Sequence, residues 1–101
     1  MAADNIREQV TAIAKDYAEK VKKEMKVDSI YLFGSFVNGT PNDESDIDIA
    51  VISQEFTGDL IEDTMKLMRI RRLIDTRIEP HPLYKDSPFL NEVITSGLRI
   101  V

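Results

Sequence analysis

The most informative part of the chain is residues 34–52, which read Gly-Ser-Phe-Val-Asn-Gly-Thr-Pro-Asn-Asp-Glu-Ser-Asp-Ile-Asp-Ile-Ala-Val-Ile. The Gly-Ser pair that opens it follows an apolar segment at residues 29–33, which predicts a short strand. Glycine, proline and asparagine break regular structure in the polar loop over residues 36–45. A second apolar strand is predicted at residues 46–52, so one loop connects two strands.

Two aspartates stand two residues apart at the start of the second strand. Because side chains alternate between the faces of a strand, Asp46 and Asp48 share one face. The intervening Ile47, Ile49 and Val51 point into a core. Two like charges on one face repel each other, and a divalent cation removes this conflict. Mg²⁺ prefers oxygen ligands and typically takes one or two carboxylates together with water and substrate phosphates, so the pair predicts a magnesium site.

The Gly34-Ser35 turn suits the other half of such a site. Gly34 lets the backbone approach a phosphate closely, and successive backbone N–H groups in the turn can form an anion-binding nest. Ser35 also fits the N-cap of a helical turn. The two roles are compatible, because a capped helix start is itself a phosphate site.

This combination resembles the active-site signature of the DNA polymerase beta-type nucleotidyltransferase superfamily, which reads Gly-Ser, a spacer and Asp-x-Asp on a strand. Gly34 and Ser35 match the first part, ten residues intervene, and Asp46 and Asp48 match the second. In size the chain is similar to the minimal nucleotidyltransferases, short proteins often encoded beside a helical HEPN-type partner. The resemblance covers most of the chain, as far as residues 75–81, and implies a polymerase beta-like nucleotidyltransferase fold.

Members of this superfamily use a third carboxylate on a neighbouring strand, and two residues here compete for that role. These residues are Asp75 and Glu79. If residues 73–82 form one strand, both lie on the same face as Arg77 and His81, so the alternation of side chains does not choose between the two acids. We favour Glu79, because Arg-Ile-Glu-Pro-His-Pro resembles a subgroup of these small proteins and Asp75 closely follows a helical stretch. For His81, which stands between two prolines, a local hydrogen bond is favoured over metal ligation.

The resemblance implies a Mg²⁺-dependent nucleotidyltransferase that moves a nucleoside monophosphate from an NTP to an acceptor hydroxyl. Gly34 and Ser35 would hold the β- and γ-phosphates of the nucleotide. Asp46 and Asp48 would bind the nucleotide through two Mg²⁺ ions. Glu79 would complete the second metal site and help to deprotonate the acceptor. The implied catalytic and metal-binding residues are therefore Asp46, Asp48 and Glu79.

The same resemblance makes ATP the expected donor and a HEPN-type toxin the expected acceptor, with this chain as the antitoxin. Larger relatives carry an added acceptor-binding domain, for which this chain has no room, so the acceptor is expected to belong to a partner or a second subunit. One alternative is a non-catalytic binding module that neutralises a helical partner by masking it. Another is a homodimeric nucleotidyltransferase that acts on a free small molecule.

Length and composition set further bounds. A chain of 101 residues with 43% hydrophobic residues predicts one domain, residues 1–101. Its net charge of −5 argues against a nucleic-acid partner, which normally requires a basic surface. The absence of cysteine excludes disulfides and thiolate zinc sites. No apolar run resembles a signal peptide or a membrane span, so a cytoplasmic location is the expectation.

The remaining elements follow from periodicity. Asn5 and Glu8 fit a capping box for a first helix, whose apolar residues recur every three to four positions as far as Met25. A second helix is predicted to start at Thr57-Gly58-Asp59 and to run to about Arg72, and a third strand ended by two prolines follows. A short helix at residues 87–95, capped by Ser87-Pro88, and a final strand at residues 98–101 complete the chain. This order predicts an α/β (α+β) fold, a small mixed β-sheet packed by helices.

Overall fold

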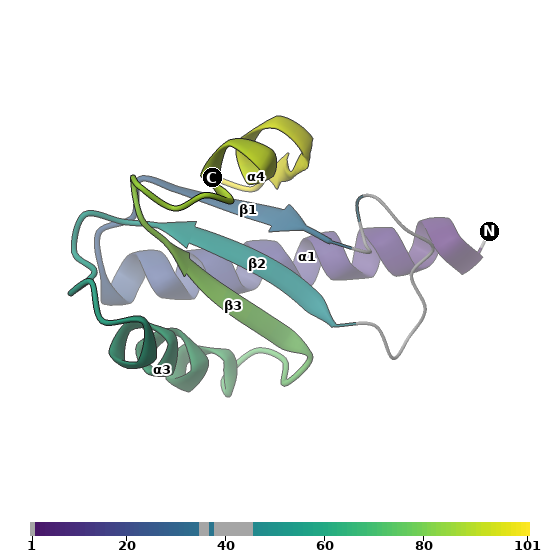
Figure 1. Ribbon diagram of the computed structural model, residues 1–101. Helices are drawn as coiled ribbons and strands as arrows, with labels where there is room; N and C mark the ends of the chain where they lie inside the picture. The colour runs from purple at the N-terminus through teal and green to yellow at the C-terminus, as the bar shows by residue number, and fades with distance from the viewer. Residues whose placement is uncertain (1, 35–36, 38–45) are drawn as a thin grey trace.

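The computed structural model describes residues 2–34, 37 and 46–101, and within them a mixed sheet is packed by helices (Figure 1). The helices are α1 (Ala2–Glu24), α3 (Leu60–Arg71) and α4 (Leu90–Ser96). The strands are β1 (Ser29–Phe33), β2 (Ile47–Ile52), β3 (Ile78–Leu83) and β4 (Leu98–Arg99). The α/β class and the order of elements predicted from the sequence are confirmed.

The strands lie in the order β3-β2-β1-β4, so β2 is an inner strand. It runs antiparallel to β1 and parallel to β3, and β4 pairs antiparallel with β1. This register places Asp48 of β2 between Phe33 of β1 and Glu79 of β3. The topology thus brings residues that lie far apart in the sequence into one row across the sheet.

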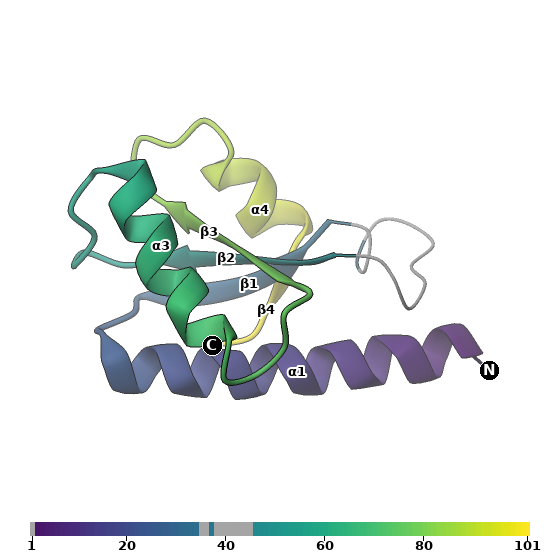
Figure 2. The same ribbon diagram turned by 90° about the horizontal axis from the view of Figure 1, so that it is seen from below.

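The main core lies between the sheet and α1, which runs along one face while α4 covers part of the other (Figure 2). The predicted apolar stripe of α1 faces this core, and Val10, Tyr17 and Val21 are fully buried. The Tyr17 hydroxyl donates a hydrogen bond of 2.7 Å to the Leu67 carbonyl oxygen, which joins α1 to α3. The opposite face carries a second, smaller apolar cluster, which includes Tyr31, Leu83 and Val93 of α4.

Helix α3 begins just after the predicted Thr57-Gly58-Asp59 segment, and Asp59 is its N-cap. Asp59 accepts hydrogen bonds from the backbone N–H groups of Ile61 and Glu62, two donors that have no partner within the helix. One turn later, the buried Asp63 accepts from the backbone of Thr57 and Gly58 and from the Thr57 and Tyr84 hydroxyls. This carboxylate therefore fixes the loop before α3 to the segment after β3.

Burial acts to raise the pKa of Asp63, but its hydrogen bonds outweigh burial and hold the pKa below the ordinary value of 3.8. Burial and the bond to Asp63 together raise the pKa of Tyr84 to about 12. Because the Asp63 pKa is lower in the folded than in the unfolded state, the carboxylate stabilises the fold above pH 3.8. That contribution is lost as the pH falls through the folded-state pKa.

Replacing Asp63 with asparagine should lower the free energy of unfolding at pH 7 by about 2–3 kcal/mol, because an amide N–H₂ would then face hydrogen-bond donors. The measurement is urea denaturation of both proteins between pH 7 and pH 3, where the difference should shrink below pH 4. Asp59→Asn is the matched control, since asparagine caps a helix as well as aspartate does. Equal unfolding curves for wild type and Asp63→Asn would contradict this interpretation.

The expectation that prolines end the third strand is wrong, because β3 continues through Pro80 and Pro82 to Leu83. The reason is its place at the edge of the sheet. Ile47 donates its N–H to the Arg77 carbonyl, so by alternation the nitrogens of both prolines face away from β2 and are not needed as ladder donors. On this outer side, the Arg71 guanidinium donates to the carbonyl oxygens of Thr76 and Ile78.

Two predicted helix starts are also corrected. Helix α1 begins at Ala2, so Asn5 lies inside it rather than at an N-cap, in keeping with the high helix propensity of the preceding alanines. Helix α4 begins at Leu90, because the Leu90 N–H donates to the Ser87 carbonyl and closes a turn over the two intervening residues. Gly97 is the C-cap of α4. Among the described helices, none combines the length and the apolarity that crossing a membrane would require.

Candidate active site

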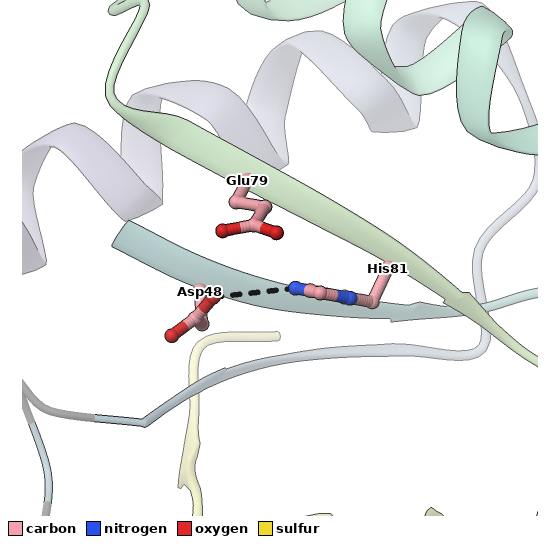
Figure 3. Close-up of side chains that lie close together, drawn as sticks. All are labelled: Asp48, Glu79 and His81. Carbon is pink, nitrogen blue, oxygen red and sulfur yellow. Dashed lines mark hydrogen bonds and ion pairs between the residues drawn. The ribbon is translucent and has the colours of Figure 1, made fainter. Parts of the chain in front are cut away.

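Three polar side chains converge on the face of the sheet that α1 does not cover. Asp48 comes from β2, and Glu79 and His81 come from the adjacent parallel strand β3 (Figure 3). Asp48 and Glu79 are register partners, and His81 follows Glu79 by two residues, so all three point to the same side. One ligand atom from each lies within 4.8 Å of those of the other two.

His81 is oriented toward Asp48. Its Nε2 lies 3.2 Å from Asp48 Oδ1, at hydrogen-bond distance, and a neutral ring protonated on Nε2 donates this bond. The Phe33 ring meets the imidazole edge-on with centroids 5.2 Å apart. Ala50, the register partner of His81, has only a methyl group, which leaves room for the imidazole beside Asp48. The ring is thus held by its strand, by Phe33 and by the carboxylate.

Gly34 lies directly beside this group, at the end of β1. Its backbone φ of +81° is an angle that residues with a Cβ rarely adopt. A Cβ added to Gly34 would also collide with the Asp48 carboxylate. The sequence predicts that Gly34 allows the close approach of a phosphate, and in the structure the glycine also makes room for Asp48 itself.

Of the two other predicted site residues, the structure describes only Asp46. Asp46 is exposed immediately before β2, and it is not part of the described Asp48–Glu79–His81 group. Ser35 lies outside the described residues. Ile47, Ile49 and Val51 are fully buried, which confirms the predicted alternation along β2.

Asp75, the competitor of Glu79, lies in the turn before β3 and its carboxylate is engaged by Arg77. The Arg77 guanidinium donates to both carboxylate oxygens, at 3.2 Å from Nε and 3.1 Å from Nη2, and the Arg77 backbone N–H donates at 2.8 Å. The side-chain hydrogen bonds from Arg77 hold the pKa of Asp75 below its ordinary value despite partial burial. Asp75 therefore stabilises the turn, while Glu79 is the acid that faces Asp48.

The place of His81 in the site is not predicted by the sequence pattern. Its two-residue spacing from Glu79 put it on the same face, which was the available signal. What the sequence did not reveal was that Ala50 leaves space for the ring to reach Asp48.

The donor set fits a divalent cation. Two carboxylates and an imidazole are all common metal ligands, and they converge from two neighbouring strands. Asp48 and His81 keep 24% and 36% of their side-chain surface exposed, so the ligand atoms are open to an incoming ion and substrate. Because Gly34 has no side chain, the Asp48 carboxylate has space beside it in this position.

Two hollows adjoin the β3 side of this group, and His81 lines both. A groove of about 680 Å³ runs beside β3, between α3 and residues 84–89, and both Glu79 and His81 line it. A smaller pocket of about 350 Å³ lies between β1, β3 and α4, where Phe33, His81 and Phe89 are among the lining residues. The site therefore has room on two sides for the parts of a larger substrate.

The family of the chain is shown by comparison with known proteins. Residues 15–101 match the family model described as "Polymerase beta, Nucleotidyltransferase", and the chain belongs to this family of nucleotidyltransferase domains. Proteins of this family are transferases that usually employ divalent metal ions. No curated protein is significantly similar to the chain in sequence.

A solved structure described as a "putative nucleotidyltransferase" from Sulfolobus solfataricus is similar to this chain with a TM-score of 0.74. The two share 21% sequence identity, and the match covers 98% of this chain and 86% of that one. At this level of identity the likeness shows a common fold, and it agrees with the family match.

Proposed function

We propose that this protein is a Mg²⁺-dependent nucleotidyltransferase of the minimal type, which transfers AMP from ATP to a hydroxyl group on a protein partner. The observation that carries the proposal is the row formed by Asp48 and Glu79 across two strands, with the Gly34 turn beside it. Family membership supplies the reaction class. The donor and the partner rest on the resemblance to minimal nucleotidyltransferases.

In the proposed reaction, the acceptor hydroxyl oxygen forms a bond to the α-phosphorus of ATP. The bond from that phosphorus to the bridging oxygen breaks, and pyrophosphate leaves. Asp46, Asp48 and Glu79 would hold two Mg²⁺ ions, which supply charge neutralisation for the triphosphate. A Glu79 carboxylate oxygen would accept the proton of the acceptor hydroxyl. The N–H groups of the Gly34-Ser35 turn would bind the β- and γ-phosphates.

The groove beside β3 supports a protein acceptor. It leads to Glu79 and His81, and apolar side chains such as Leu60, Leu83 and Phe89 line its walls. Leu60 and Phe89 are 60% and 62% exposed, so the groove offers apolar surface on which a protein partner would pack. The net charge of −5 makes a polyanionic acceptor unfavourable. A HEPN-type toxin, inactivated by the transferred AMP, is the partner we propose.

A second candidate function is masking of a helical partner without catalysis. It is favoured by the exposed apolar residues of α3, among them Ile61 and Met65, which are 73% and 50% exposed. Such a helix face can bind an amphipathic partner helix without any nucleotide. Both functions predict a complex with the partner, so they are distinguished by whether AMP is transferred to it.

The test is transfer of label from α-³²P-ATP with Mg²⁺, using this protein and the product of its neighbouring gene. Covalent label on the partner, absent when EDTA is added, is the result that the transferase proposal expects. Complex formation without label would support masking instead. Label on a free small acceptor with no protein partner would favour a homodimeric small-molecule enzyme.

A further inference from the structure

We propose that His81 Nε2 is a direct ligand, together with oxygens of Asp48 and Glu79, of one divalent cation in this site. The nitrogen ligand would make the site favour cations that bind imidazole well, such as Co²⁺ and Zn²⁺, more strongly than carboxylates alone would. This inference rests on the proposed metal site but does not depend on ATP or on the acceptor.

The separation of the ligand atoms supports a shared ion. Two ligands at right angles, each about 2.1 Å from one metal ion, lie about 3.0 Å apart. The distance from His81 Nε2 to Asp48 Oδ1 is 3.2 Å, close to that value. Glu79 contributes an oxygen within 4.8 Å of both, and its exposed side chain is free to adjust. Small movements would therefore place all three atoms around one ion.

The neighbouring residues hold the His81 ring in a position from which Nε2 can bind a cation. The Phe33 ring meets the imidazole at 63° between planes, and β3 fixes its backbone beside β2. Figure 3 shows the His81 ring pointing to Asp48, with the Glu79 carboxylate above the line that joins these two side chains. A neutral imidazole with its proton on Nδ1 has a lone pair on Nε2 for a cation. Cation binding would then replace the hydrogen bond between Nε2 and Asp48.

The chemistry of the ligand explains the expected selectivity. Mg²⁺ is a hard cation that keeps oxygen ligands and several waters, so an imidazole adds little to its affinity. Co²⁺ and Zn²⁺ bind imidazole nitrogen well, and their affinities exceed those of earlier divalent ions at most sites. The decisive quantity is therefore the dependence of each affinity on His81, rather than the order of affinities itself.

The chain contains a single histidine, which makes the test specific. In the proton NMR spectrum of the Co²⁺-loaded protein, a metal-bound imidazole should give one exchangeable, strongly shifted ring N–H signal. In His81→Gln that signal should be absent, and calorimetry should show Co²⁺ binding weakened about 10- to 100-fold. Binding of Mg²⁺ should change less than about 3-fold.

Three results would overturn the inference: no shifted imidazole signal in the wild type, unchanged Co²⁺ affinity in His81→Gln, or equal losses of Co²⁺ and Mg²⁺ affinity. The last would mean that His81 only positions Asp48. Exposed Asp16→Asn on α1 is the control for Co²⁺ that binds nonspecifically at surface carboxylates away from the site. Measuring Mg²⁺-supported AMP transfer in parallel separates the two proposals, because nitrogen ligation can hold whether or not transfer occurs.

Discussion

Asp48→Asn should abolish nucleotidyl transfer, with a loss of at least about 1,000-fold, while the fold persists. Asp48 lies on the inner strand β2, between Phe33 and Glu79, and is the acid toward which His81 points. Removing its charge would weaken cation binding at the point where the triphosphate is neutralised, a contribution of several kcal/mol. The measurement is the rate of label transfer at saturating ATP and Mg²⁺.

The same substitution should leave the melting temperature unchanged or slightly raised. Asparagine has the same shape, and its side-chain oxygen still accepts the His81 hydrogen bond. Replacing one of two facing carboxylates also removes a repulsion between like charges. Asp16→Asn, an exposed change on α1, serves as the control and should keep full activity. Full turnover in Asp48→Asn would refute its proposed role.

Glu79→Gln and Asp75→Asn should have opposite phenotypes. Glu79 faces Asp48 in register and borders the groove, so its amide variant should lose about 100-fold or more in transfer with little change in stability. Asp75 is held by Arg77 in the turn before β3. Its variant should keep transfer within about 3-fold and lose about 0.5–1.5 kcal/mol of stability.

Paired measurements of transfer rate and thermal unfolding on these two variants identify the third carboxylate. If Asp75→Asn lost transfer while Glu79→Gln kept it, the assignment of Glu79 would be wrong. The comparison is well matched, because each substitution removes one negative charge without changing side-chain size.

Local patterns were sufficient for most of the fold. The alternation of residues 46–52 predicted which side chains of β2 enter the core, and Thr57-Gly58-Asp59 predicted where α3 starts. Both depend on a few neighbouring residues. The sequence failed where structure depends on distant neighbours: Pro80 and Pro82 continue β3 only because that strand lies at an edge.

The site shows the same division. Asp48 and Gly34 could be selected from spacing along one segment. Choosing between Asp75 and Glu79 required the register of β3 against β2, which periodicity does not contain. The approach of His81 to Asp48 depends further on the small Ala50 across the strand pair. These contacts join residues that are far apart in the sequence, so no local motif predicts them.

Anomalous diffraction from crystals grown with Mn²⁺ and a non-hydrolysable ATP analogue tests most directly whether these acids gather cations around a triphosphate. We expect an anomalous peak between the Asp48 and Glu79 carboxylates, with the analogue's phosphates reaching the Gly34 turn. A map with no peak there at millimolar Mn²⁺ and nucleotide, or with nucleotide bound elsewhere, would contradict the proposed site.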